Sequence, residues 1–249
     1  MKLRSFLAII VLVITTFFSS GSRAAGDMPT PIRIVIVGDS TVCNYPLTRP
    51  QRGWGMYIQE RFKEGTVDVI NLAASGRSTK TFIKEGRWKS ALAQKPDYIF
   101  IQFGHNDSHP PTKPEATDAA TDYKDYLRRY IDDSRAIGAT PILVTPMVRR
   151  DFDAHGKILE SGLQNYRSLR SYADAMKEVG LEKKVAVIDL YTSSKALAEK
   201  LGPAGSAQLA DLPDDSTHFN EKGARAMADL VMQELPKAAP KLVVDLKTP

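Results

Sequence analysis

Three residues in this sequence suit nucleophilic catalysis. Ser40 follows an apolar, mostly β-branched run at 32–37 and then Gly38, which allows a sharp turn. A serine hydroxyl attacks a carbonyl carbon well only when a base removes its proton, so a histidine is required. His218 stands three residues after Asp215, and a tight turn there lets the carboxylate accept the Nδ1 proton and leaves Nε2 as the base. The set predicts acyl transfer through a covalent intermediate.

Simpler structural readings stay open for the same residues. Ser40 and its polar neighbours are also typical of a cap on the following segment, and 215–218 reads equally as the N-terminal cap of a last helix. The other histidines are less suited to act as the base. We interpret His155, in a polar loop, and His109, ahead of two prolines, as surface residues.

Acyl transfer also needs hydrogen-bond donors for the oxyanion of its tetrahedral intermediate. Each donor can lower the barrier by on the order of 3 kcal/mol. Two more polar segments follow apolar runs and supply suitable groups, the backbone N–H of Gly76 and the side-chain amide of Asn106. The backbone N–H of Ser40 would be a third donor. These groups can meet if the apolar runs are parallel strands, because the carboxyl ends of such strands share one edge of the sheet.

Two other kinds of reactive site are weaker. His105 and His109 flank Asp107, but no third histidine is close in sequence, so we expect no metal and no cofactor. Cys43 is the only cysteine and cannot form an internal disulfide. We interpret it as a packed thiol, with a nucleophile as the alternative.

Strand-like and helix-like segments alternate along the chain. Apolar runs typical of buried strands lie at 32–37, 67–72, 97–103, 141–144 and 185–190. Helical spacing of apolar residues occupies 54–62, 116–138, 163–179 and 221–235, whereas 203–213 has no period and is expected to be a loop. This alternation predicts an α/β fold, with three α/β/α layers around a five-stranded parallel sheet and right-handed crossovers.

The first 24 residues are typical of a secretory signal peptide. Lys2 and Arg4 begin it, the mainly apolar run at 6–18 is short for a membrane span, and small residues precede the expected cleavage point. We therefore expect residues 1–24 to be removed and the protein to be secreted or periplasmic, without stable membrane association afterwards. An uncleaved anchor is the alternative.

Charge argues against a nucleic-acid partner. The chain of 249 residues has a formal net charge of +5, but the expected signal holds three basic residues and no acidic one. Residues 25–249 therefore carry +2, from 31 basic and 29 acidic residues that are mixed along the chain. This length suits a single domain, with a core at 32–235 and a C-terminal tail at 236–249 that is expected to be a surface strap or disordered.

Four segments resemble, in order, the four blocks of the SGNH (GDSL-type) hydrolases. They are Gly38-Asp39-Ser40, 73–78 around Gly76, Gly104-His105-Asn106-Asp107 and Asp215-Ser216-Thr217-His218. Other segments look like the rhamnogalacturonan acetylesterase branch of that superfamily: Arg52-Gly53-Trp54-Gly55, Gly76-Arg77-Ser78, Glu85-Gly86-Arg87-Trp88 and Gln102-Phe103. The likeness spans 32 to about 235. Thr41 departs from the leucine of the founding motif, but the acetylesterase branch typically has threonine or a small residue there.

The resemblance implies a flavodoxin-like SGNH hydrolase fold and a role for each matching residue. Ser40 would be the nucleophile, His218 the base and Asp215 its orienting partner. The Ser40 and Gly76 N–H groups and the Asn106 amide would form the oxyanion hole. Asp39 and His105 would support the site. As substrate-binding residues we consider, with core packing or solvated charge as the alternative, Trp54, Arg77, Trp88 and Arg149, together with Tyr45 and Arg150.

These implications together predict an exported monomeric serine esterase that removes acetyl groups from plant cell-wall polysaccharide. The acetylated polysaccharide or oligosaccharide would be its partner, and the substrate would be rhamnogalacturonan, another pectin or xylan. Two alternatives stay open: a lipid or thioester acyl hydrolase of the same fold, and a non-catalytic sugar-binding module. An acyltransferase shares the chemistry up to the release of the acyl group.

Overall fold

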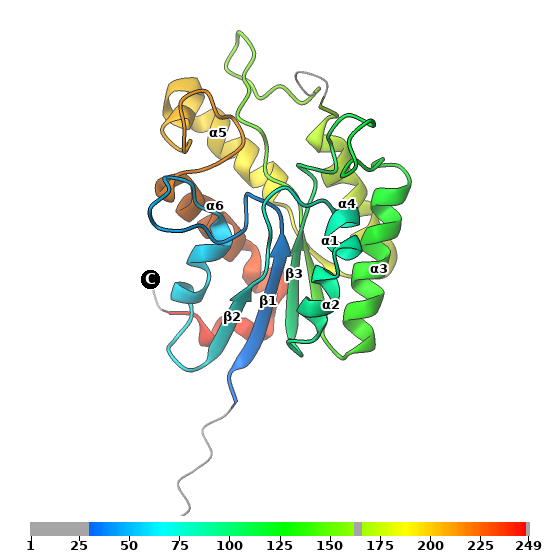
Figure 1. Cartoon of the computed structure of the whole chain (residues 1–249). Helices are drawn as coiled ribbons and strands as arrows, with labels where there is room; N and C mark the ends of the chain where they lie inside the picture. The colour runs from blue at the N-terminus through cyan, green and yellow to red at the C-terminus, as the bar shows by residue number, and fades with distance from the viewer. Residues whose placement is uncertain (1–29, 162–165, 248–249) are drawn as a thin grey trace, which may run out of the picture.

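Five parallel strands form the centre of the computed structural model, which describes residues 30–161 and 166–247 (Figure 1). In chain order they are β1 (Ile32–Gly38), β2 (Val67–Asn71), β3 (Tyr98–Gln102), β4 (Thr140–Val144) and β5 (Ala186–Ile188). Their order across the sheet is β2-β1-β3-β4-β5, and every neighbouring pair is parallel. The predicted α/β fold with a five-stranded parallel sheet is confirmed.

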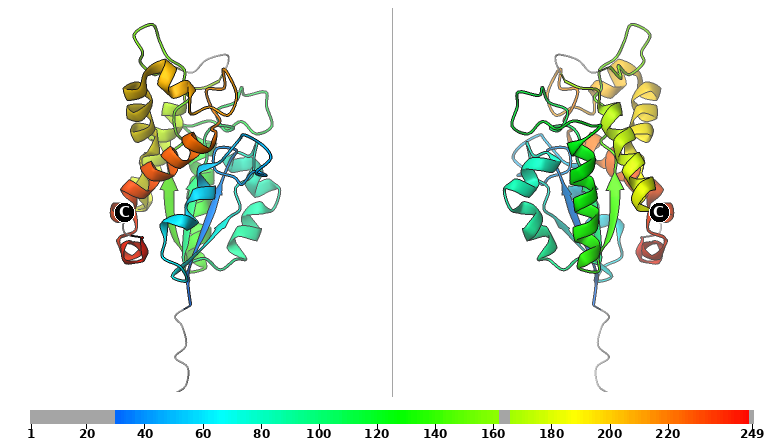
Figure 2. Two further views of the ribbon diagram at one scale, coloured as in Figure 1. Left: turned by 90° about the vertical axis from the view of Figure 1, so that its left-hand side faces the viewer. Right: turned by 90° about the vertical axis from the view of Figure 1, so that its right-hand side faces the viewer.

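The strand order places β1 where the chain changes direction across the sheet. From β1 the chain moves to β2 on one side, then returns to β3 on the other side. In open α/β sheets the crevice beyond the carboxyl ends of the strands at such a point is the usual ligand site. Ser40 follows β1 by two residues and therefore emerges there. The loops beyond the carboxyl ends of the strands gather at one end of the molecule (Figure 2).

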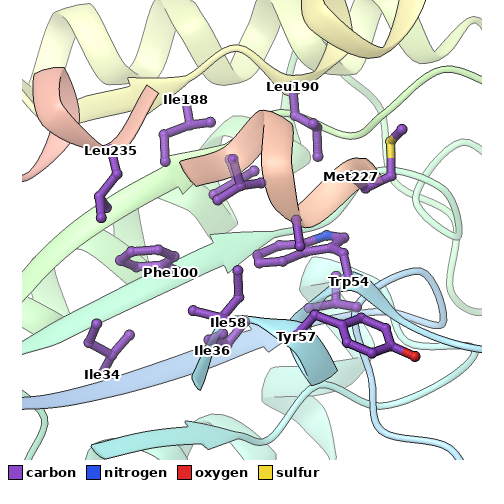
Figure 3. Close-up of a cluster of buried hydrophobic side chains, with 14 of the residues drawn as sticks. Ile34, Ile36, Trp54, Tyr57, Ile58, Phe100, Ile188, Leu190, Met227 and Leu235 are labelled. Atoms are coloured by element: carbon purple, nitrogen blue, oxygen red, sulfur yellow. The ribbon is translucent and has the colours of Figure 1, made fainter. Parts of the chain in front are cut away.

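Helices cover both faces of the sheet. One face packs against η1 (Trp54–Tyr57), α6 (Glu221–Ala238) and η3 (Pro240–Asp245), with η2 (Gln59–Arg61) beside them. The other face packs against α1 (Thr79–Lys84), α2 (Arg87–Leu92), α3 (Asp122–Ala136) and α4 (Leu169–Lys183). The two layers stand on opposite sides of the strands in Figure 1. The period-two alternation of β1 feeds both cores, as Ile34 and Ile36 face one layer and Val35 and Val37 the other. Figure 3 shows Ile34 and Ile36 within the first core.

The predicted helix at 54–62 is wrong in kind. The segment forms η1 and η2, two short 3-10 helices, because its backbone is tied to the loop that follows β1. The Trp54 N–H donates to the oxygen of Thr41 at 3.0 Å, and the Gly55 N–H donates to the oxygen of Val42 at 3.2 Å. The apolar stripe that suggested an α-helix instead packs into the core.

Three helices were not predicted. The six-residue α1 and α2 are too short to produce a periodic pattern. α5 (Leu190–Ala207) enters the segment expected to be a loop, and it bends at Gly202, where φ is 67° and ψ is 177°. Asp189 caps α5 by accepting a hydrogen bond from the Thr192 N–H, so the fifth strand stops at Ile188, two residues before the predicted end.

Other boundaries differ by a few residues. α3 begins later and ends earlier than predicted, and α4 begins and ends later, although 163–165, the start of the predicted fourth helix, lie outside the described residues. α6 extends past the predicted core boundary. Within the tail, η3 buries Leu242, and Leu246 forms a β-bridge with Phe62, so its described part is a packed strap. The expected signal peptide also lies outside the described residues. No helix among the described residues is long and apolar enough to cross a bilayer.

Candidate active site

Ser40, His218 and Asp215 form a hydrogen-bonded chain at the carboxyl edge of the sheet. The Ser40 Oγ lies 2.9 Å from the His218 Nε2, and the His218 Nδ1 lies 2.9 Å from the Asp215 Oδ2. The other carboxylate oxygen, Oδ1, accepts from the backbone N–H groups of Thr217 and His218, each at 2.7 Å. The expected tight turn is present, and it fixes the carboxylate against the ring. The three residues can therefore act as a nucleophile, a base and an orienting group.

The loop after β1 holds Ser40 in place. The Asp39 Oδ1 accepts from the Thr41 N–H at 2.9 Å and from the Thr41 hydroxyl at 2.7 Å. Gly38 allows the tight approach that this turn needs, since a Cβ there would lie 2.7 Å from both the Gln102 oxygen and the Val42 Cγ2. The Tyr45 hydroxyl donates to the Ser40 carbonyl oxygen at 2.8 Å. The attacking oxygen therefore stands on a rigid turn.

The surroundings of His218 and Asp215 shift the pKa of each residue in the direction that makes His218 a stronger base. Burial alone would lower the pKa of His218, but its hydrogen bond to Asp215 and the negative charges of Asp215, Asp211 and Asp39 outweigh burial and raise that pKa above its usual 6.5. Burial would raise the pKa of Asp215, yet the hydrogen bonds from His218 and Thr217 hold it well below its ordinary value. Asp215 is therefore ionised whenever His218 accepts a proton.

The expected oxyanion donors face the same cavity as Ser40. This cavity has a volume of about 550 Å³, and its lining includes Ser40, Gly76 and Asn106. Gly76 has a φ of +79° and nothing within 4 Å of the place where a Cβ would stand. The Asn106 Nδ2 donates to the Arg77 oxygen at 3.0 Å, which orients the amide and leaves its second hydrogen for an oxyanion. The structure brings the expected donors together.

Asp107 anchors the loop that carries Asn106, a role that the sequence did not indicate. Its fully buried carboxylate accepts from the Thr79 N–H at 3.2 Å, the Thr79 hydroxyl at 2.5 Å and the Thr117 hydroxyl at 2.9 Å. Thr79 is the first residue of α1, so the carboxylate also meets the positive end of that short helix. Burial raises the pKa of Asp107 to about 7 despite these hydrogen bonds.

Asp39 and His105 lie buried beneath the cavity. The His105 Nδ1 is 3.5 Å from the Asp39 Oδ2, close enough for attraction but without hydrogen-bond geometry, and neither atom has a hydrogen-bond partner among the described residues. Burial lowers the pKa of His105. Burial would raise the pKa of Asp39, but His105 and Thr41 hold it below its usual value. Both side chains sit where a supporting role was expected.

Arg149 lines the cavity, but Arg150 does not. The Arg149 Nη2 donates to the His105 oxygen and to the Ser108 Oγ, each at 3.1 Å, and its guanidinium lies 4.5 Å from the centre of the Tyr166 ring. Arg150 is instead a buried tether of the catalytic loop. Its Nη2 donates to the backbone oxygens of Asp215 and His218 at 2.8 and 2.7 Å. The expectation that Arg150 contacts an acidic sugar is therefore wrong.

His109 lies in a partly exposed loop, as expected, but it is also part of the cavity, which the sequence did not indicate. His109 lines the cavity, with its Nδ1 2.5 Å from the Glu115 carboxylate and its ring 5.2 Å from that of Tyr166. The pattern of two prolines after it gave no sign of Glu115, which lies six residues further on. His155 is exposed, as expected.

The aromatic residues considered for sugar binding belong to the core or the scaffold. Trp54 is fully buried among core side chains (Figure 3). Its Nε1 donates to the Gln102 Oε1 at 2.8 Å. Trp88 is 2% exposed and donates to Asp133. Tyr45 is buried under the loop of Ser40. The Arg77 side chain turns to Glu85 at 3.0 Å, away from the cavity lining. The packing alternative holds for the three aromatic residues.

One group of described residues is close enough to hold a metal ion. A ligand atom from each of Asp211, Asp215 and His218 lies within 4.8 Å of the other two. Two of the three already hydrogen-bond to each other as described above. Among the described residues, His105, Asp107 and His109 do not form such a group. Cys43 is a buried thiol whose pKa burial raises, which fits the packed interpretation.

Comparison with known proteins agrees with this geometry. The model of the GDSL-like Lipase/Acylhydrolase family matches residues 36–226. The rhamnogalacturonan acetylesterase RhgT of Bacillus subtilis is 40% identical over 223 residues, which cover 83% of this chain and 90% of that protein. The rhamnogalacturonan acetylesterase of Emericella nidulans is 26% identical and covers 80% of this chain and 83% of its own.

Solved structures extend the comparison. The crystal structure of protein YxiM from Bacillus subtilis has a TM-score of 0.72 and 31% identity, and the match covers 87% of this chain and 58% of that one. The acetylxylan esterase Axe2 from Geobacillus stearothermophilus has a TM-score of 0.65 at 21% identity, over 84% of this chain and 95% of that one. The second likeness concerns the fold alone.

Proposed function

The chain belongs to the GDSL-like Lipase/Acylhydrolase family and is a carboxylic ester hydrolase of the carbohydrate acetylesterase type, and we propose that it removes acetyl groups from plant cell-wall polysaccharide outside the cytoplasm. The substrate class comes from the relatives, which are named as rhamnogalacturonan acetylesterases and, at lower identity, an acetylxylan esterase. Export rests on the pattern of residues 1–24. The proposal includes a monomeric enzyme without a cofactor.

The observation that carries the proposal is the hydrogen-bonded chain from Ser40 through His218 to Asp215 at the wall of the cavity. The Ser40 Oγ attacks the acetyl carbonyl carbon while His218 takes the hydroxyl proton at Nε2. Asp215 stabilises the imidazolium that forms. The carbonyl oxygen becomes an oxyanion, which accepts hydrogen bonds from the N–H groups of Ser40 and Gly76 and from the Asn106 amide.

Collapse of the intermediate and release of the acetyl group need three further proton transfers at the same ring. His218 returns its proton to the departing sugar oxygen, the ester bond breaks, and an acetyl group stays on Ser40. His218 next accepts a proton from a water molecule that attacks the acetyl carbon. Breakdown of the second tetrahedral intermediate releases acetate, and His218 gives the proton back to the Ser40 Oγ.

The lining of the cavity favours a small acyl group on a polar substrate. The described lining residues are polar, charged or glycine, apart from the single aromatic ring of Tyr166, and no aliphatic side chain is among them. A long acyl chain needs an apolar slot, because burial against carboxylates and amides does not release free energy in the way that burial against hydrocarbon does. A lipid acyl hydrolase is the weaker alternative for this reason.

Two measurements test the proposal. Acetate release from acetylated pectin and acetylated xylan should be detectable with the wild-type enzyme and lost in Ser40→Ala. A panel of acetate against octanoate esters should favour the acetate. Octanoate turned over faster than acetate would support the lipid acyl hydrolase, and no ester turnover at all would support a non-catalytic module.

A further inference from the structure

A second cavity adjoins the catalytic one, on the other side of the loop that carries Asp215. Its volume is about 460 Å³, which lies within the range of small-ligand sites. Asp151, Asp214, Asp215 and Ser216 line both cavities, so the two spaces are separated only by this loop and by the start of the segment after Arg150. In Figure 1 that segment projects beyond the carboxyl end of the sheet, beside α5.

The far wall of the second cavity is apolar. It consists of residues from the segment after β4, the end of α5 and the loop before Asp215, namely Phe152, Pro203, Ala207, Ala210, Leu212 and Pro213. Leu212 is a large apolar side chain that is 55% exposed, so the described chain leaves more than half of it uncovered. An aromatic ring and an exposed aliphatic side chain in the lining of one cavity suit the apolar C–H face of a sugar ring.

The polar groups of the second cavity are acceptors. Four carboxylates line it, and those of Asp151, Asp211 and Asp214 can accept hydrogen bonds from hydroxyl groups, while that of Asp215 is held by His218 and the turn around it. Arg150 is the only cationic residue in the described lining, but it is 9% exposed and its Nη2 is engaged with the backbone oxygens of Asp215 and His218. The arginine that lines the catalytic cavity is Arg149.

Building on the proposed function, we propose that the second cavity is a subsite for a neutral sugar residue of the polysaccharide chain whose acetylated residue occupies the catalytic cavity. The shared lining places an occupant of one cavity next to an occupant of the other, as in a continuous chain. The apolar wall packs against the ring and the carboxylates accept from its hydroxyls. A uronate is disfavoured, because its charge would meet four carboxylates and no accessible cation among the described lining residues.

Two truncations remove the apolar wall without touching the catalytic cavity. Phe152 and Leu212 line the second cavity only. Leu212→Ala carries little risk to folding because the side chain is exposed, whereas Phe152 also packs against the small core cluster around Val148. Leu181→Ala is the matched control. Leu181 is 84% exposed near the end of α4, it lines neither cavity, and it lies toward the amino ends of the strands, away from the site.

The experiment compares p-nitrophenyl acetate with acetylated xylo-oligosaccharides of increasing length. We expect kcat/KM on the longer oligosaccharides to fall about tenfold in Leu212→Ala and Phe152→Ala, with p-nitrophenyl acetate unaffected and Leu181→Ala like wild type. Leu212→Lys, which adds a cation at the rim, should improve galacturonate-containing acetylated oligosaccharides relative to the neutral ones. If Leu212→Ala and Phe152→Ala changed kcat/KM equally on p-nitrophenyl acetate and on the oligosaccharides, or left kcat/KM on the oligosaccharides unchanged, the subsite would be overturned. Failure of the wild-type enzyme to release acetate from any acetylated saccharide would instead overturn the proposed function.

Discussion

The guanidinium of Arg150 donates a hydrogen bond of 2.7 Å to the backbone oxygen of His218. The same nitrogen donates to the backbone oxygen of Asp215, and the Arg150 N–H donates to the oxygen of Ser216 at 2.8 Å. Its charged plane also lies 4.4 Å from the centre of the Phe219 ring. Arg150, in the segment that follows β4, therefore holds the base and its carboxylate in position relative to Ser40.

Replacing Arg150 should damage catalysis through the position of this loop. In Arg150→Ala, two carbonyl oxygens lose their donor, and each buried group left without a partner destabilises the fold by about 1–3 kcal/mol. Arg150→Lys keeps the charge but not the fork of donors. We expect kcat on p-nitrophenyl acetate to drop markedly in both variants, more in Arg150→Ala, with a lower Tm.

The control is Arg170→Lys, because Arg170 is an exposed arginine of α4 that lines neither cavity and pairs with Glu160. Wild-type kcat in Arg150→Ala, with Tm unchanged, would show that the loop is held by its own turn alone.

The triad should respond unequally to truncation. Ser40→Ala removes the attacking oxygen and His218→Ala removes the base, so each should lower kcat by roughly four to six decades. Asp215→Ala should do less damage, because the orienting group usually contributes less than the other two. Ester turnover with circular dichroism as the folding control checks this order. Full activity in His218→Ala would assign the base to another residue.

Much of the site was predictable because catalysis here depends on the ends of buried strands. The segment from Asp215 to His218 lies between α5 and α6, and only its internal turn is a local pattern. The β-branched run before Gly38 is also a local pattern, and the parallel sheet brings its end to the edge that carries the site without any further long-range information. The polar blocks at Gly76 and Asn106 follow the same rule. The fold class could therefore be inferred from the residues alone, whereas the roles of the triad and oxyanion residues were assigned through the resemblance of four segments to the blocks of the family.

What could not be predicted depends on contacts between distant segments. Arg150 looked like a substrate-binding residue or a solvated charge, because nothing in the sequence around it reveals that the carbonyl oxygens of Asp215 and His218 lie beside it. Trp54 looked available for a sugar, but its N–H is satisfied by Gln102, 48 residues away. Asp107 looked like the end of a motif, and its burial becomes visible only when Thr79 and Thr117 close over it. Short helices such as α1 leave no periodic trace.

Activity should rise with pH through a midpoint above 6.5. His218 acts as a base only when neutral, and its pKa is raised, so a larger fraction of the ring is protonated and inactive at mildly acidic pH than for a free histidine. The acid limb of kcat/KM for p-nitrophenyl acetate reports this pKa. Asp215→Asn should move the limb to lower pH, since the largest stabilising partner of the imidazolium is lost.

Asp211→Asn provides the graded comparison for the acid limb. Asp211 adds negative charge near His218, and Asp215 also accepts a hydrogen bond from the His218 ring. Asp211→Asn should therefore move the acid limb to lower pH as Asp215→Asn does, but by less. An acid limb that stays in place in both variants would contradict the assignment of the limb to His218.

Asp107 should make the fold less stable as the pH rises from about 4 to about 7. Its folded pKa is about 7 whereas its ordinary value is 3.8, so between these values the folded chain binds a proton that the unfolded chain has released. Stability therefore falls with rising pH in this window, and the contribution is fully present only below the ordinary pKa. Asp107→Asn cannot titrate and keeps the acceptor oxygen for Thr79 and Thr117. We expect the unfolding free energy of wild type, measured relative to Asp107→Asn by urea denaturation, to decline from pH 4 to pH 7. A difference that is constant over this range would mean that Asp107 is already ionised at pH 4 in the folded protein.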